Sequence, residues 1–388
     1  MSKQRFVKQE VGEREFVFFP GLASMRVGKE GLEVTTFSEP IQAETWFVYA
    51  INNVRPRVKH IIVPTWKGVY HEGVFTWLNQ HGISLTFLNE DFSTSHSFVP
   101  KPYARNGINI KRLQYGLTWD MRYEMARDLM KRKVQGQIDN LDWLGKSSRI
   151  VQGKSSRMEV RKDIALARKD ITNARKVLAN ARKVLANART RLEALKEAIP
   201  NTVVERDRLM GIEGLASQIY WETLSRVEIN WDKKHVLTRF MTIGERQGLV
   251  GRNGRHAIRP FHSMLNYVLG LAIVRLRIAC IGLELDSEVG IYHEDDEYRE
   301  SLLYDLVEVM RARIERGLIE MCMEGLEVGW FTYVAQTGRV ALVADLRRRL
   351  LEAWDKDLMG MAYEEVKGFK GWMVEKMEGY KGLVARHG

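Results

Sequence analysis

The hydrophobic pattern of this chain changes its period once, near residue 105. Before that point, short runs rich in β-branched and aromatic residues, such as GLEVTTF and HIIV, alternate with Gly, Pro and polar turns, which is typical of β-strands. After it, apolar residues recur at helical spacing nearly to the end, and prolines become scarce. A chain of 388 residues also exceeds the usual domain of roughly 100–200 residues.

The pattern therefore predicts an α+β fold with two domains. Residues 1–104 form a small N-terminal β-rich domain with one short helix in GVYHEGVFTWLNQHG, where Val69, Val74, Trp77 and Leu78 fall on one side and Gly82 caps the end. Residues 105–388 form a large all-α domain.

A repeat with a period of seven, ARKDITN-ARKVLAN-ARKVLAN-ARTRLEA, begins at Ala167. Its Ala, Ile and Leu residues alternate spacings of four and three, which predicts a heptad seam on a long helix at about 157–198. The Arg-Lys pairs face away from that seam. They suit either a basic surface for a phosphate backbone or the solvated face of a long helix.

The net charge is +11, and residues 151–196 alone hold 13 Lys and Arg against four Asp and Glu. The rest of the chain is nearly neutral, so the charge is a weak indication of nucleic-acid binding. Cys280 and Cys322 lie in apolar stretches and are expected to be buried thiols in a reducing compartment. No signal peptide is evident and no apolar run approaches the roughly 20 residues of a bilayer span, so we expect a cytoplasmic protein without a membrane segment.

Three stretches contain candidates for chemistry. In RLMGIEGLASQIYWETL, small residues surround Glu213 and would let a ligand or a second backbone come near it. A Glu at a helix start is also a common first-turn acid that the helix dipole favours.

In YHEDDEYRESLLYDLVE, His293 precedes the acidic run Glu294–Glu297, and Ser301, Asp305 and Glu308 then share one helix face. Carboxylates suit Mg²⁺ or Mn²⁺, and a histidine favours Mn²⁺. The spacing is equally consistent with exposed acids paired to nearby arginines.

The third stretch, NGRHAIRPFHSMLNYVLGLA, leads from a loop with glycine and arginine through Pro260 into an apolar helix. Arginines and backbone amides at a helix start suit phosphate, although the bare motif is weak.

Taken in order, these stretches resemble the CRISPR-associated protein one family. The matching motifs are GIEGLASQIYW, RPFHSMLNYVLGLA, GIYH and SLLYDLVEVMR, and HIIVPTWKGVYHEGVFTWLNQHGISLTFLNEDF resembles the family's β-domain. The resemblance implies metal ligands at Glu213, His293 and Glu308, with Asp305 as a catalytic acid that is either a ligand or a neighbour of one. Residues expected near DNA are Arg252, Arg255, Arg259, Asn266, Tyr267 and Arg311. Glu294–Glu297 are not expected to be ligands.

The resemblance further implies an antiviral-defence enzyme of spacer acquisition. It would join the 3′-OH ends of captured DNA fragments into the CRISPR repeat with Mg²⁺ or Mn²⁺, and cut branched DNA as an endonuclease. Its expected partners are DNA, a second copy of itself and CRISPR-associated protein two. Two alternatives stay open: a non-enzymatic basic DNA-binding scaffold that uses the heptad helix, and a related integrase of a mobile element.

Overall fold

The computed structural model of the chain describes residues 7–10, 16–18, 22–29, 31–38, 42–49, 58, 60–63, 68–88, 94–98, 107–146, 164–233, 236–245, 257–293, 300–334 and 338–387. The chain divides into two compact units, residues 1–108 and 109–388. The domain boundary predicted at 104/105 lies outside the described residues.

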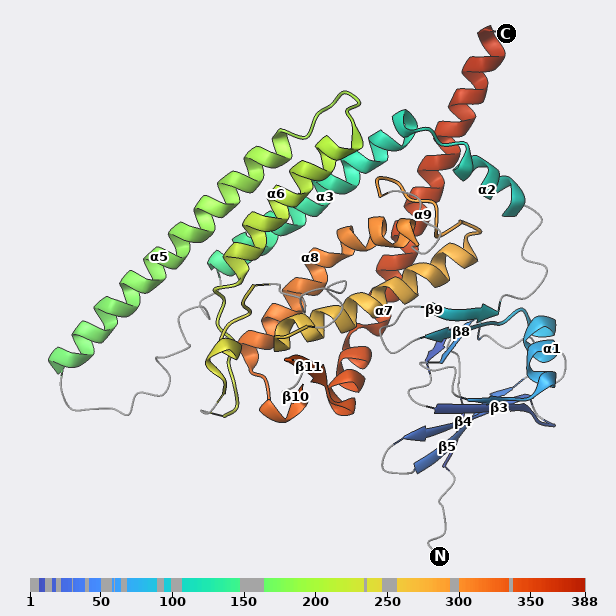
Figure 1. Cartoon of the computed structure of the whole chain (residues 1–388), viewed down its shortest axis with the longest axis horizontal. Helices are drawn as coiled ribbons and strands as arrows, with labels where there is room; N and C mark the ends of the chain where they lie inside the picture. The colour runs from blue at the N-terminus through green and yellow to red at the C-terminus, as the bar shows by residue number, and fades with distance from the viewer. Residues whose placement is uncertain are drawn as a thin grey trace, which may run out of the picture. The chain divides into compact units, whose positions relative to one another are not determined.

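Among its described residues, the first unit has two sheets and one helix (Figure 1). One sheet has the strand order β1-β5-β4-β3-β7 and the other β2-β6-β8-β9. The strands are β1 Val7–Glu10, β2 Phe16–Phe18, β3 Leu22–Val27, β4 Gly31–Ser38, β5 Gln42–Tyr49, β6 His60–Val63, β7 Val69–Tyr70, β8 Ser84–Leu88 and β9 Thr94–Phe98.

Helix α1, Glu72–His81, supplies Val74, Trp77 and Leu78 to the core of this unit. It ends at Gly82, whose backbone is left-handed at φ 68°, a conformation that glycine adopts at little cost. The prediction that Val69 belongs to the apolar face of this helix is wrong, because Val69 lies in strand β7 and is 64% exposed.

In the residues that the structure describes, the second unit consists of long helices and one hairpin. The helices are α2 Gly107–Tyr115, α3 Trp119–Lys146, α5 Ile164–Glu197, α6 Arg206–Leu224, α7 Pro260–Gly282, α8 Ser301–Glu324 and α9 Ala344–His387, with short 3₁₀ turns at Thr238–Phe240 and Val328–Trp330. Strands β10, Phe331–Val334, and β11, Arg339–Leu342, pair antiparallel. An entirely helical domain was expected, so this hairpin is a departure from the prediction.

Helices α3, α5 and α6 lie side by side, and α8 packs against both α3 and α7 (Figure 1). Helices α3 and α8 approach closely where Gly136 faces Ala312, since a Cβ added at Gly136 would come within 2.5 Å of the alanine Cβ. The missing side chain lets functional groups on the two helices reach one another directly.

Helix α5 carries the heptad repeat. In its described C-terminal part, the seam residues Ala188 and Leu192 are buried, whereas Arg182 and Lys183 are exposed. The seam therefore packs inward as predicted, against α3 and α6. The predicted start of the helix near residue 157 lies outside the described residues.

Helix α7 is long and apolar enough to cross a membrane by length and composition alone, which corrects the expectation that no such run exists. In the structure, 78% of its most apolar window is buried within the protein. It is a core helix of the second unit, in contact with α8 and α9.

Candidate metal and phosphoryl-transfer site

Helix α6 presents Glu213 in its interior, two turns after the helix begins at Arg206. The alternative that Glu213 is a first-turn acid is therefore wrong. The side chain is 17% exposed, and its Oε1 accepts a hydrogen bond from Ser217 Oγ at 2.8 Å, one turn later. A Cβ added at Gly211 or Gly214 would meet nothing within 4 Å among the described residues, so the helix leaves open space beside this carboxylate.

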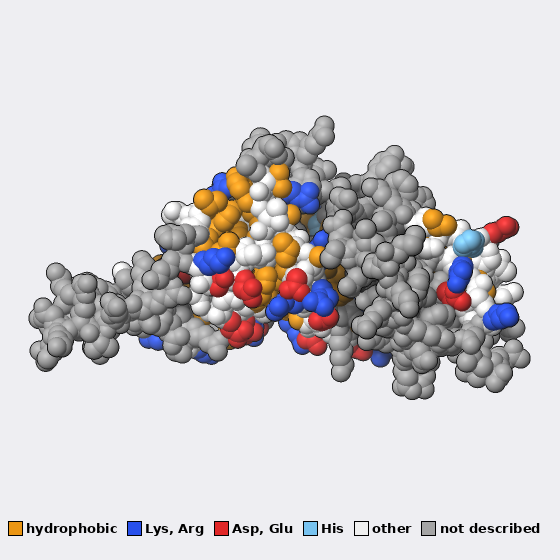
Figure 2. Space-filling view, turned by 90° about the horizontal axis from the view of Figure 1, so that it is seen from below, with side chains coloured by type: hydrophobic (Ala, Val, Ile, Leu, Met, Phe, Trp, Pro, Cys, Tyr) orange, Lys and Arg blue, Asp and Glu red, His pale blue; other side chains and the backbone are white. Residues whose placement is uncertain are grey.

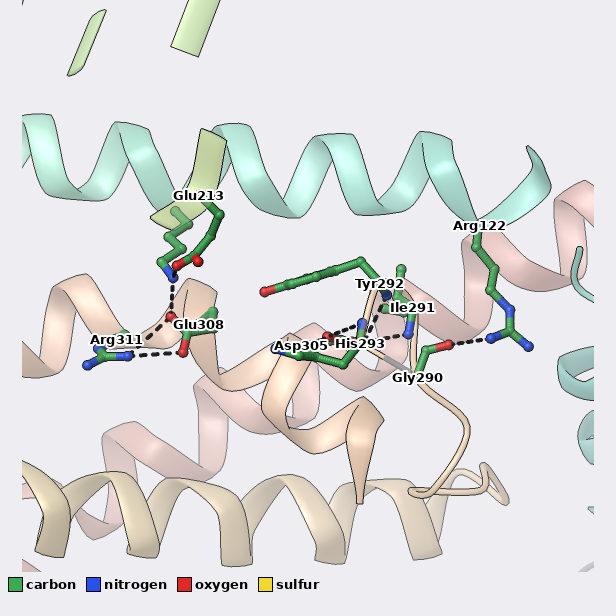
Figure 3. A network of polar contacts seen from close by, with 10 residues as sticks. Arg122, Glu213, Gly290, Ile291, Tyr292, His293, Asp305, Glu308 and Arg311 are labelled. Carbon is green, nitrogen blue, oxygen red and sulfur yellow. Dashed lines mark hydrogen bonds and ion pairs between the residues drawn. The ribbon is translucent and has the colours of Figure 1, made fainter. Parts of the chain in front are cut away.

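Lys133 of α3 connects Glu213 with Glu308 of α8. Its ammonium forms ion pairs with Glu213 Oε1 and, at 2.6 Å, with Glu308 Oε2. Three helices thus bring two partly buried carboxylates onto one cationic nitrogen (Figure 3). Buried carboxylates of this kind need a positive partner, because removing a charge from water without one is costly.

Arg311 supplies a second positive charge to the same cluster. Its guanidinium lies 3.0 Å from Glu308 Oε1 and 2.8 Å from Glu315 Oε1, and it stacks over the Trp221 ring at 5.7 Å from the ring centroid. The guanidinium is held in place on several sides, so Glu308 keeps a fixed orientation toward Lys133.

A second group of contacts holds His293. The imidazole Nδ1 hydrogen-bonds with Asp305 Oδ1, and the backbone N–H of His293 donates to the same oxygen at 3.2 Å. Asp305 Oδ2 accepts from the backbone N–H groups of Ile291 and, at 3.1 Å, Tyr292. An imidazole that donates through Nδ1 leaves Nε2 free to bind a metal, as is common for histidine ligands.

Asp305 is fully buried, with no exposed surface. A carboxylate has about four lone-pair positions, and all of them are used by the four contacts to residues 291–293. This geometry supports Asp305 as the residue that positions His293, with no lone pair left for a metal. The alternative of Asp305 as an exposed acid paired with an arginine is wrong.

Residues 286–293, which follow α7, are held from several sides. Arg122 of α3 donates to Gly290 O at 3.0 Å, and Gln114 of α2 donates to the carbonyls of Asp286 and Val289. A Cβ at Gly290 would come within 2.7 Å of His293 O. The loop therefore needs glycine at this close approach.

Tyr292 extends from this loop toward the cluster of Glu213 and Glu308 (Figure 3). Its ring packs against His293 with 4.7 Å between ring centroids. Burial raises the pKa of the Tyr292 hydroxyl well above its usual value of 10.0, and nearby acids raise it further, namely Asp305, Glu308 and Glu213. Tyr292 lies between the two groups of polar residues and stays protonated.

The structure does not bring the three expected metal ligands, Glu213, His293 and Glu308, together at one point. In the part of the chain that the structure describes, no three His, Cys, Asp or Glu side chains are grouped closely enough to hold one metal ion. Glu213 and Glu308 meet through Lys133, while His293 is held by Asp305 beyond Tyr292. The donor set still fits a divalent cation, because the ammonium already acts as a stand-in cation between two carboxylates.

The residues expected near DNA do not form one described group. Arg252 and Arg255, like Glu294–Glu297, lie outside the described residues. Tyr267 donates to Arg347 O at 3.1 Å, and burial raises its pKa to about 12. Asn266 is half-buried, and Arg259 donates to the backbone carbonyl oxygen of Arg239. Arg311 belongs to the cluster of Glu308, Lys133 and Glu213 described above.

No uniformly basic surface marks a DNA path on the described part of the face in Figure 2. Lys and Arg side chains lie there among Asp and Glu, with hydrophobic side chains between them.

Lys133 was not identified as a site residue from the sequence, because it lies in the run KRK, which is typical of solvent-exposed charged side chains. Its position in the helical period could have revealed it, because it falls on the face of Met130, Val134 and Gln137, all buried. A charged residue on an apolar helix face indicates a buried partner.

The family model described as CRISPR associated protein Cas1 matches residues 55–356. The chain is similar to CRISPR-associated endonuclease Cas1 1 of Thermodesulfovibrio yellowstonii, with 28% identity over 318 residues, 78% of this chain and 81% of that protein.

Two solved structures resemble it in fold. A Cas1 protein from Thermotoga maritima has a TM-score of 0.61 and 15% identity, with 93% of this chain and 97% of that chain covered. A casposase bound to integration product has a TM-score of 0.60 and 17% identity, with 94% and 91% covered.

Proposed function

This chain belongs to the family of CRISPR-associated Cas1 proteins, and on that premise we propose that it is the integrase of CRISPR spacer acquisition. It joins the 3′-OH ends of captured DNA fragments into the CRISPR repeat, and the same site cuts DNA as an endonuclease. The observation that carries this proposal is the convergence of Glu213 and Glu308 on one cationic nitrogen.

Glu213, Glu308 and His293 Nε2 would hold the metal, Mg²⁺ or Mn²⁺. Two carboxylates with open neighbouring positions suit a hard divalent ion, and the imidazole favours Mn²⁺. Bound there, the ion would neutralise charge on the phosphate oxygens and lower the pKa of the attacking hydroxyl. Asp305 keeps the imidazole in the orientation and tautomer that leave Nε2 available.

The reaction is a transesterification at phosphorus. The 3′ oxygen of the fragment forms a bond to a phosphorus of the repeat, the bond from that phosphorus to the 3′ oxygen of the repeat breaks, and the attacking hydroxyl loses its proton. In the hydrolytic reaction, water takes the place of the hydroxyl. The negative charge that develops on the phosphoryl oxygens needs positive groups nearby, and Arg311 is a fixed cation of the cluster.

The partners of this reaction are the captured fragment, the CRISPR repeat, a second copy of the chain and Cas2. The reaction takes place on the DNA of the cell, so we place the protein in the cytoplasm. Open space beside Gly211 and Gly214 supports access of a phosphate to the Glu213 side of α6.

A strand-transfer assay tests the proposal. A labelled fragment with free 3′-OH ends is incubated with the protein, Cas2 and supercoiled DNA that bears a CRISPR repeat, with Mg²⁺, Mn²⁺ or EDTA. We expect joined product with metal, none with EDTA, and none with the Glu213→Gln or Glu308→Gln variants. Equal joining in EDTA would refute the metal-dependent site.

A matched plasmid without the repeat separates two kinds of integrase. Joining confined to the repeat plasmid supports spacer acquisition. Equal joining at unrelated sequences would instead indicate an integrase of a mobile element.

A further inference from the structure

Lys133 is a buried charge for which the proposed reaction has no use. It lies in the interior of α3 with its side chain 7% exposed, and its flexible stem ends between Glu213 and Glu308. A lysine ammonium is a compact point charge. It therefore occupies the position between the carboxylates where a divalent cation would bind.

The ammonium and a divalent ion cannot both occupy this position. Each of Glu213 and Glu308 already has a cationic partner, because Lys133 contacts both carboxylates and Arg311 also contacts Glu308. A divalent ion added at the same nitrogen position would meet a like charge at contact distance, and in a poorly solvated site such repulsion is strong. Binding of the metal thus requires the ammonium to leave.

The structure also offers the departing ammonium an acceptor. Gln137 lies one helical turn after Lys133 on the same buried face of α3, and its side-chain oxygen has no hydrogen-bond partner among the described residues. Residues at i and i+4 are neighbours on a helix surface. A buried acceptor without a partner is costly, so an incoming ammonium would satisfy it.

We propose that Lys133 is an internal counter-ion that neutralises Glu213 and Glu308 while the site is free of metal, and that metal binding moves its ammonium to Gln137. This inference rests on the proposed metal site and deepens it. Lys133 then has two effects: it stabilises the metal-free protein, and it weakens the affinity for the metal because each binding event must displace it.

The test uses the full-length protein and its Lys133→Met variant, which keeps the stem and removes the charge. Lys131→Met is the matched control, since it removes the same charge two residues away on α3. Mn²⁺ affinity is measured by titration calorimetry at fixed pH, and the melting temperature is measured with EDTA and with Mn²⁺.

For Lys133→Met we expect tighter Mn²⁺ binding by about tenfold or more, the scale on which groups around a metal site change its affinity. We also expect a lower melting temperature in EDTA that Mn²⁺ restores. Gln137→Leu should weaken Mn²⁺ binding, because the ammonium loses its second acceptor, and Lys131→Met should change neither quantity.

A second variant keeps the test decisive if Lys133→Met folds poorly in EDTA. Adding Glu213→Gln to Lys133→Met removes the carboxylate that has lost its ion-pair partner, since Arg311 still pairs Glu308, and should restore part of the lost melting temperature. A double variant no more stable than Lys133→Met would overturn the counter-ion role.

Failure of this inference is distinct from failure of the metal site. If the wild type binds Mn²⁺ through Glu213 and Glu308 but Lys133→Met binds it equally or more weakly, the counter-ion role is wrong and the metal site stands. If the wild type binds no Mn²⁺ at all, the metal site itself is wrong and the inference fails with it.

Discussion

The four contacts of the Asp305 carboxylate make Asp305→Asn a sharp test of how the site is held together. The substitution keeps the shape of the side chain but replaces one oxygen by an N–H₂ group. That group would face either the N–H groups of Ile291 and Tyr292 or those of His293. Donor would then face donor inside a fully buried position.

The size of the effect follows from these contacts. Two of the four hydrogen bonds to a charged acceptor are lost, at about 1.5–3 kcal/mol each, and the neutral amide is cheaper to bury than the carboxylate, which offsets part of this loss. We expect a net destabilisation of about 3 kcal/mol, which for a helical unit of this size corresponds to a fall in melting temperature of about 6–12 °C.

The assay is thermal unfolding followed by far-ultraviolet circular dichroism, combined with strand transfer below the melting temperature of the variant. Strand transfer should fall even where the protein is folded, because in either orientation of the amide His293 loses the charged acceptor that fixes its tautomer. Asp345→Asn is the matched control, since that carboxylate is partly exposed at the start of α9 beside Arg348 and Arg349, and its melting temperature should fall by much less than that of Asp305→Asn.

An Asp305→Asn variant that melts with the wild type would refute the reasoning. It would mean that the loop of residues 290–293 is not held by this carboxylate. Unchanged strand transfer by the folded variant would separately refute the role of Asp305 in orienting His293.

Three further perturbations test the surroundings of the site. Gly136→Ala should push α3 away from Ala312 of α8 and lower the free energy of unfolding by about 1–3 kcal/mol. Calorimetric unfolding measures this change, and an unchanged melting temperature would contradict the close contact. Gly290→Ala should reduce strand transfer more than stability, because the loop carries His293; equal activity of the folded variant would contradict this. Deletion of residues 167–187, three whole heptads, removes the exposed Arg182 and Lys183 but should preserve strand transfer. A sharp loss of DNA affinity, with a flatter dependence of that affinity on salt concentration, would favour the basic DNA-binding scaffold instead.

The sequence predicted the α+β fold and the family, and both predictions are confirmed. Long stretches of consistent periodicity made the helices clear, and the buried seam at Ala188 and Leu192 shows why a heptad pattern is so informative. Strand β7 and the β10–β11 hairpin were missed because they are short and directly precede helices α1 and α9, so the helical period of the neighbouring residues hides them.

The site residues themselves stay predictions, although their surroundings are now defined. Spacing placed Ser301, Asp305 and Glu308 on one helix face, and α8 does begin at Ser301. Spacing could not distinguish a buried carboxylate from an exposed one, because burial depends on what α3 and α6 bring to that face. One partner of Glu308, Arg311, is three residues away, but the other is Lys133, and no local pattern links two positions so far apart in the chain.

The most direct test of the proposed site is anomalous diffraction from crystals grown with Mn²⁺. We expect one anomalous peak within bonding distance of Glu213, Glu308 and His293 Nε2, with the Lys133 ammonium displaced from the carboxylates. A peak bound by other residues, or no peak at Mn²⁺ concentrations that support strand transfer, would contradict a metal site built from these three side chains.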